Sequence, residues 1–231
     1  MHANTYLIRF VLSLALIAVA IPAAAQQASE QVKQQLSDTC KRTIDAAMVK
    51  LRPELSEYPE IKNKSNLVLL VPAADFNAFA NHQSRQISIP VMWCIQTWFL
   101  VDAQAHFYRN PQLREAVKKY TEYLNQRQKQ AIHSGPFDDT ILQPFDKFAG
   151  VPVLADTSAE DRKLLARRED MMVESLAFVL GHEIGHLALN HKRYTEITAA
   201  QARRQEDRAD EFAAGLLGRS RISLIPAMFT L

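Results

Sequence analysis

Two histidines and a glutamate form the part of this sequence with the clearest chemical meaning. His182, Glu183 and His186 follow the order H-E-x-x-H inside an apolar stretch of helical periodicity. Residues four apart lie on one face of a helix, so both imidazoles can bind the same metal ion. Zinc lowers the pKa of a coordinated water, and a carboxylate beside it can take the proton. The motif therefore predicts a zinc site with Glu183 as the general base for attack on a peptide carbonyl.

A zinc site of this type needs a third protein ligand. Lys192 stands where the extended motif of other zinc peptidases has a third histidine, and His191 is expected on a different helix face. Four carboxylates follow within one and a half turns of a predicted helix: Glu206, Asp207, Asp210 and Glu211. The first and third share one face, and the second and fourth share a neighbouring one. Within the first pair, one carboxylate can bind zinc while the other accepts an N–H from a ligand histidine. Spacing alone does not decide between the pairs.

Three segments resemble the gluzincin metallopeptidases of the HtpX and CAAX-prenyl-protease type, which include soluble periplasmic members. They are residues 77–80 with the strand expected at 87–91, the H-E-x-x-H helix with His191 five residues later, and Glu206-x-x-Ala209-Asp210. The resemblance spans residues 66–218 and selects Glu206 as the third ligand of one zinc ion per chain. It also implies that Asp210 orients a histidine, and Ala209 stands where this register requires it.

The sequence departs from that family in three respects. Residues 100–157 have no recognised counterpart, the family's transmembrane helices are absent, and only a short segment follows the third-ligand helix. The residue that stabilises the oxyanion is therefore left open among three candidates, which are His191, Tyr194 and Arg219.

The first 25 residues are typical of a secretory signal peptide. Arg9 precedes an apolar run over residues 10–21, and Pro22 and three alanines lead to Gln26. The alternative is a membrane anchor, but the run is too short to span a bilayer comfortably. We therefore expect residues 26–231 to form one metallopeptidase domain, secreted across the inner membrane into the periplasm without stable membrane insertion.

Charge and cysteine content agree with an exported enzyme. The 27 Lys and Arg residues against 25 Asp and Glu residues include no basic stripe, which argues against nucleic acid as a partner and leaves a protein or peptide substrate. Cys40 and Cys94 are the two cysteines, and an oxidising compartment favours a disulfide between them. Two buried free thiols are the alternative.

The remaining pattern predicts a mainly helical α+β fold with a small sheet beside the site. Residues 67–71 form an apolar run that suits a buried strand, and Pro90 marks residues 87–91 as an exposed edge strand. We expect an extended substrate to pair with that edge. Residues 133–152 are predicted to be an irregular loop. Helices are expected over residues 28–52, 111–131, from Ser158 into the histidine cluster, and over 199–218.

Three functional hypotheses follow from this pattern. The chain is a zinc endopeptidase, a zinc-binding or chaperone-like module with little catalysis, or a helical secreted protein with an accidental motif. Zinc content separates the third hypothesis from the others, and the effect of Glu183→Gln on proteolysis separates the first from the second.

Overall fold

The computed structural model describes residues 23–71, 77–134 and 142–225. The chain divides into two compact units, Met1–Gln35 and Leu36–Leu231, and the second unit contains every residue of the site described below. Residues 1–22, which include most of the expected signal peptide, lie outside the described residues. Within the described ranges, the structure has no helix with the length and apolar character needed to cross a membrane.

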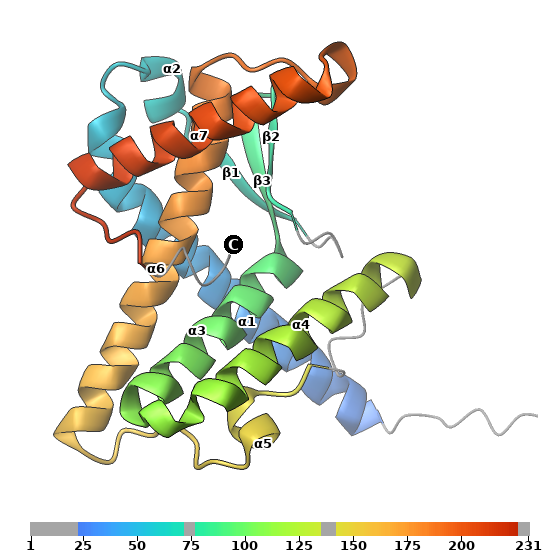
Figure 1. Ribbon diagram of the computed structural model, residues 1–231, viewed down its shortest axis with the longest axis vertical. Helices are drawn as coiled ribbons and strands as arrows, with labels where there is room; N and C mark the ends of the chain where they lie inside the picture. The colour runs from blue at the N-terminus through green and yellow to red at the C-terminus, as the bar shows by residue number, and fades with distance from the viewer. Residues whose placement is uncertain (1–22, 72–76, 135–141, 226–231) are drawn as a thin grey trace, which may run out of the picture. The chain divides into compact units, whose positions relative to one another are not determined.

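Helices make up most of the described chain, and three short strands form a sheet (Figure 1). This arrangement confirms the predicted mainly helical α+β class. The elements in chain order are α1 (Ala23–Leu51), η1 (Arg52–Leu55), α2 (Pro59–Lys62), β1 (Val68–Val71), β2 (Phe79–Asn81), β3 (Gln86–Pro90), α3 (Val91–Arg109), η2 (Pro111–Leu113), α4 (Arg114–Ser134), α5 (Phe145–Ala149), α6 (Ala159–Ala188), η4 (Tyr194–Glu196) and α7 (Ala199–Arg219).

The sheet has the strand order β1-β3-β2, with β1 parallel and β2 antiparallel to β3. The prediction that residues 87–91 form an edge strand is therefore wrong, because β3 pairs on both sides. Pro90 is tolerated because it is the last residue of the strand, and Val91 already begins α3. The two edges are β1 and β2, and Phe79 on β2 is 47% exposed.

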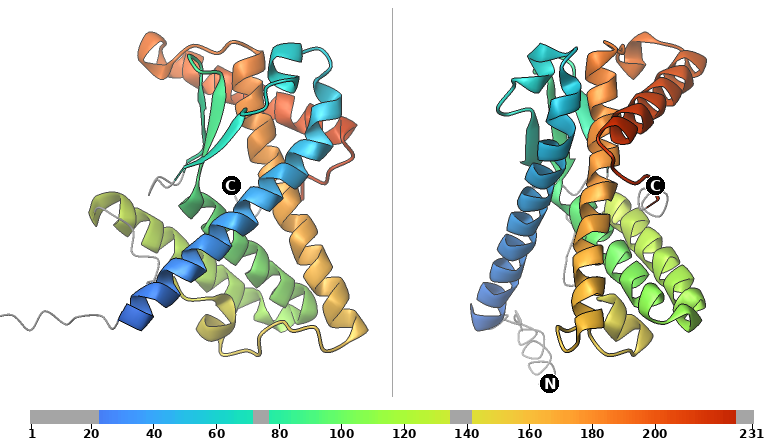
Figure 2. Two further views of the ribbon diagram at one scale, coloured as in Figure 1. Left: turned by 180° about the vertical axis from the view of Figure 1, so that it is seen from behind. Right: turned by 90° about the vertical axis from the view of Figure 1, so that its left-hand side faces the viewer.

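Helix α6 is the central element of the core. Its C-terminal half lies between the sheet on one side and α7 on the other (Figure 2, right). Leu176, Leu180 and Ile184 on this half have no exposed surface. Each such side chain stabilises the fold by about 1.5–3 kcal/mol when it leaves water. The helix that ends in the histidine motif is therefore fixed by apolar packing on both sides.

Small residues allow α7 to cross α6 closely. A Cβ atom added to Gly185 would lie 3.2 Å from the Cα of Ala209, and one added to Gly181 would lie 3.3 Å from the Cα of Ala213. Both alanines are fully buried. Because these contacts involve backbone atoms, a larger residue on either side would move α7 away from the histidines.

Two further features differ from the sequence-based expectation. Helix α3 was not predicted, because it is apolar on nearly all sides and lacks the polar face that marks a surface helix. The expected loop over residues 133–152 contains α5 instead, while residues 135–141 lie outside the described residues. Phe145, the first residue of this short helix, is buried and packs on Tyr120, with ring centroids 5.2 Å apart.

Cys40 on α1 and Cys94 on α3 form a disulfide, with Cα atoms 6.1 Å apart. Both residues are buried in the core. The bridge attaches α1 to the first turn of α3, directly after β3. The pairing expected from the cysteine count is thus present in the structure.

Removing this bridge should lower the free energy of unfolding. The cysteines are 54 positions apart, and closing a loop of that length is worth about 4 kcal/mol. We expect the double variant Cys40→Ala/Cys94→Ala to lose about that amount in urea denaturation followed by circular dichroism. Reduced wild-type protein is the control for the lost sulfur atoms. Equal stability, or two free thiols in peptide maps of exported protein, would contradict the assignment.

Candidate metal centre

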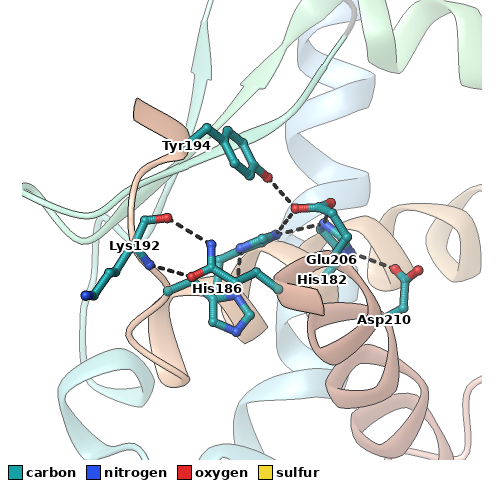
Figure 3. Close-up of polar contacts among 8 residues, drawn as sticks. His182, His186, Lys192, Tyr194, Glu206 and Asp210 are labelled. Atoms are coloured by element: carbon teal, nitrogen blue, oxygen red, sulfur yellow. Dashed lines mark hydrogen bonds and ion pairs between the residues drawn. The ribbon is translucent and has the colours of Figure 1, made fainter. Parts of the chain in front are cut away.

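The H-E-x-x-H segment occupies the last turns of α6. The helix begins with the predicted cap, because the Ser158 hydroxyl accepts the Asp161 backbone N–H at 3.0 Å. At its other end, the rings of His182 and His186 face the same point, and their Nε2 atoms lie 3.0 Å apart (Figure 3). The helical spacing of four therefore brings the two nitrogens together.

Glu206 reaches these nitrogens from α7. One carboxylate oxygen lies 3.3 Å from Nε2 of His182, and the other lies 3.4 Å from Nε2 of His186. Helix α7 begins with a capping box, in which Thr198 and Gln201 bond reciprocally, and this box fixes where the helix starts. Among the described residues, His182, His186 and Glu206 are the group of His, Cys, Asp or Glu that could hold a metal ion, with ligand atoms within 4.8 Å of one another.

Asp210 bonds to His182 at Nδ1, the ring nitrogen that faces away from His186 and Glu206. Its carboxylate accepts the Nδ1–H of His182 at 2.8 Å (Figure 3). The proton on Nδ1 leaves Nε2 with a lone pair directed at the shared point. Asp207 and Glu211, the alternative pair from the sequence, are exposed and do not line the cleft. The structure therefore brings Glu206 and Asp210 to the histidines.

The donor set fits a zinc-type ion. Burial and, after it, the charge of the nearby His182 lower the pKa of His186 to about 3, so this ring is a neutral nitrogen donor near pH 7. Two imidazole nitrogens and one carboxylate are a common three-ligand set for catalytic zinc, which leaves a fourth position open.

Glu183 lies beside this group but contributes no ligand atom to it. Burial raises the pKa of its carboxyl to about 7, while His182 and a hydrogen bond from the Ala80 backbone N–H act in the opposite direction. Ala80 belongs to β2, so the edge strand of the sheet and the glutamate of the motif are in direct contact. A buried carboxyl with a raised pKa is suited to proton transfer.

His191 contacts the site in a way that sequence reasoning missed. Helix α6 ends at Ala188, and Asn190 adopts a left-handed conformation with φ of 50°. The chain therefore folds back, and Nδ1 of His191 lies 2.9 Å from Nδ1 of His186. The expectation that His191 points to another face assumed a continuing helix. Asn190 was the available signal, because asparagine often ends a helix in this conformation. Burial, followed by Arg208, lowers the pKa of His191.

Of the three oxyanion candidates, Tyr194 is the one that lines the cleft with its hydroxyl at the site. The hydroxyl donates a hydrogen bond to Glu206 (Figure 3). Burial raises the pKa of Tyr194, and the bond to Glu206 raises it further, so the hydroxyl keeps its proton. Arg219 lies at the end of α7, where its Nε is 3.9 Å from Glu54.

The site opens into a cleft of about 830 Å³. Its lining includes Phe79 and Ala80 of the β2 segment and the segment from Lys192 to Tyr194. Phe178, Val179 and Trp93 add apolar surface, while His82 and Arg193 add polar surface. A cleft of this form can hold an extended polypeptide across the candidate metal ligands.

Comparison with known proteins agrees with this chemistry. Residues 88–220, from β3 through α7, match the family described as Peptidase U49. The match includes residues 100–157, which had no counterpart in the resemblance noted from the sequence. Comparisons with curated proteins and with solved structures gave no significant match. Because the matched region covers more than half of the 231 residues and contains His182, Glu183, His186, Glu206 and Asp210, this chain belongs to the Peptidase U49 family.

Proposed function

We propose that this peptidase is a zinc-dependent endopeptidase of the gluzincin type. Membership in a peptidase family supports protein or peptide substrates. The observation that carries the proposal is the convergence of His182, His186 and Glu206, with Glu183 beside them in an open cleft. The resemblance to the HtpX and CAAX-prenyl-protease type supports the same ligand pattern, with glutamate as the third ligand.

Each residue of the site would have a separate role in hydrolysis. Zinc, when bound, would lower the pKa of a coordinated water and polarise the substrate carbonyl. Glu183 would take the proton from this water, and its raised pKa makes it a better proton acceptor than an exposed glutamate. It would then return the proton to the leaving amine nitrogen. Asp210 would keep His182 in the tautomer that binds metal.

Strand β2 replaces residues 87–91 as the proposed docking edge for substrate. It is an edge of the sheet, it lines the cleft, and its Ala80 contacts Glu183. Backbone pairing to such an edge holds a peptide extended without strict sequence dependence. The scissile carbonyl would then lie between β2 and Tyr194.

We also propose that the chain is exported to the periplasm and cleaved before Gln26, leaving residues 26–231 as the peptidase domain. The disulfide supports an oxidising compartment, and the layout of the first 25 residues supports cleavage. N-terminal sequencing of exported protein that finds Met1 retained would refute the cleavage.

Glu183→Gln should abolish proteolysis while zinc stays bound. Glutamine keeps the shape of the side chain but cannot accept the proton, so the rate should fall on the order of 10²–10⁴-fold or more. A casein-type degradation assay, together with metal analysis, measures both effects. Glu169→Gln, on an exposed position of α6, is the matched control. Near-normal activity of the Glu183 variant would show that it is not the base. Zinc binding without proteolysis in the wild type would instead favour a binding or chaperone-like module.

The two carboxylates on α7 should affect zinc differently. Glu206→Ala should remove most of the zinc, because two histidines alone hold it weakly. Asp210→Ala should weaken affinity by about 10–100-fold, as the loss of a partner to a ligand histidine does. Asp207→Ala and Glu211→Ala, on the neighbouring face, are the controls and should bind normally. Full zinc in the Glu206 variant with loss in the Asp210 variant would reverse the two roles. Full zinc in both would place the third ligand elsewhere.

Tyr194→Phe should lower kcat with little change in KM. We propose that the hydroxyl turns from Glu206 to the oxyanion during reaction, and loss of one such donor costs on the order of 10²–10³-fold in kcat. KM should change little, because in this proposal β2 and not Tyr194 binds the substrate backbone. Steady-state kinetics of this variant are compared with those of Tyr108→Phe, an exposed tyrosine on α3. A rise in KM at unchanged kcat would assign Tyr194 to binding alone.

A further inference from the structure

We propose that His191 is a positioning residue for the metal centre. Its Nδ1 accepts the Nδ1–H of His186 and so keeps Nε2 of His186 free to bind the ion. The inference rests on the metal site proposed above and adds a residue that neither the H-E-x-x-H motif nor the third-ligand pattern includes.

The contact between the two histidines is direct and shielded from water. The Nδ1 atoms are 2.9 Å apart, the ring centroids are 4.8 Å apart, and the ring planes meet at 79°. Both residues are 6% exposed. A hydrogen bond in such a site is not weakened by competing water.

The proton positions follow from the directions of the four nitrogens. Nε2 of His186 faces His182 and Glu206, so metal binding requires its lone pair there. The one proton of the neutral ring must then be on Nδ1, which points at His191. Nδ1 of His191 can accept this hydrogen bond only if the His191 ring carries its own proton on Nε2. Nε2 of His191 is buried and has no hydrogen-bond partner in the described structure. The hydrogen bond of the His191 ring is therefore the one between its Nδ1 and His186.

The backbone holds His191 in this place. Its N–H donates to the carbonyl of His186 at 3.1 Å, which closes the end of α6. The turn residue Asn190 accepts a hydrogen bond from Arg85 at 3.2 Å through its side chain. On the other side, the Gln205 side chain forms two hydrogen bonds to the backbone of Lys192, at 2.8 and 2.9 Å. Because Gln205 precedes Glu206, the segment with His191 is fixed to the helix that supplies the third ligand.

The two ligand histidines thus have different supports. Asp210 is 58% exposed at its side chain and is an acceptor only, whereas His191 is buried and can accept or donate. A buried support also fixes the ring orientation by packing. His186 should therefore depend on His191 as His182 depends on Asp210.

Two variants separate hydrogen bonding from packing. His191→Phe fills the space but has no acceptor, whereas His191→Asn places its amide oxygen where Nδ1 stands. Zinc affinity is measured by competition with a chelator, and folding by circular dichroism. We expect His191→Phe to bind zinc about 10–100-fold more weakly than the wild type. His191→Asn should stay within about threefold of the wild type if its oxygen restores the acceptor. Equal loss in both folded variants, or no loss in His191→Phe, would overturn the proposal.

A measurement on the wild type decides the matter if the phenylalanine variant does not fold. Nuclear magnetic resonance of the ¹⁵N-labelled, zinc-loaded protein should show the His191 proton on Nε2 and a scalar coupling between the two Nδ1 atoms across the hydrogen bond. A proton on Nδ1 of His191 would overturn the proposal. His186→Ala is the control for the site itself. If His186→Ala keeps full zinc affinity, the proposed metal site is wrong. If His186→Ala loses zinc affinity while His191→Phe keeps it, the metal site stands and only the role of His191 is rejected.

Discussion

The close crossing of α6 and α7 is the constraint on which the candidate site depends. The first helix supplies His182, Glu183 and His186, and the second supplies Glu206 and Asp210. Their side chains meet only because Gly181 and Gly185 have no Cβ to separate the backbones. Gly185, at one of the two variable positions in H-E-x-x-H, is thus required because α7 packs too closely for a side chain. The histidines and the glutamate of the motif serve the chemistry of the site.

Burial around this crossing sets the chemistry of the groups within it. The apolar packing that fixes α6 also removes water from His186 and Glu183. Desolvation favours the neutral form of each, which lowers the pKa of the histidine and raises that of the glutamate. The ring is thereby kept as a neutral nitrogen that could bind a metal ion, and the carboxyl becomes more basic than an exposed glutamate. The same core therefore stabilises the fold and adjusts the site.

The sequence predicts the parts of the molecule that depend on local signals. Ser158 marks the start of α6, the expected helix over residues 199–218 matches α7, and the spacing within both helices gives the shared faces. The order of strands could not be predicted, because pairing of β3 on both sides depends on contacts distant in sequence. Helix α3 has no polar face to reveal it. His191 was misplaced because the turn at Asn190 reverses the chain where a continuing helix was assumed.

The division of the three candidate ligands between two helices has a thermodynamic consequence. An ion held by His182, His186 and Glu206 would cross-link α6 and α7 without a covalent bond. Ligands that bind only the folded state shift the folding equilibrium by mass action, by about 2.7 kcal/mol when the free ion is at 100 times its dissociation constant. Folding of this peptidase would then depend on the metal supply of its compartment. A chelator would loosen the helical crossing as well as stop the reaction, and the metal-poor protein would itself become a better substrate for other proteases.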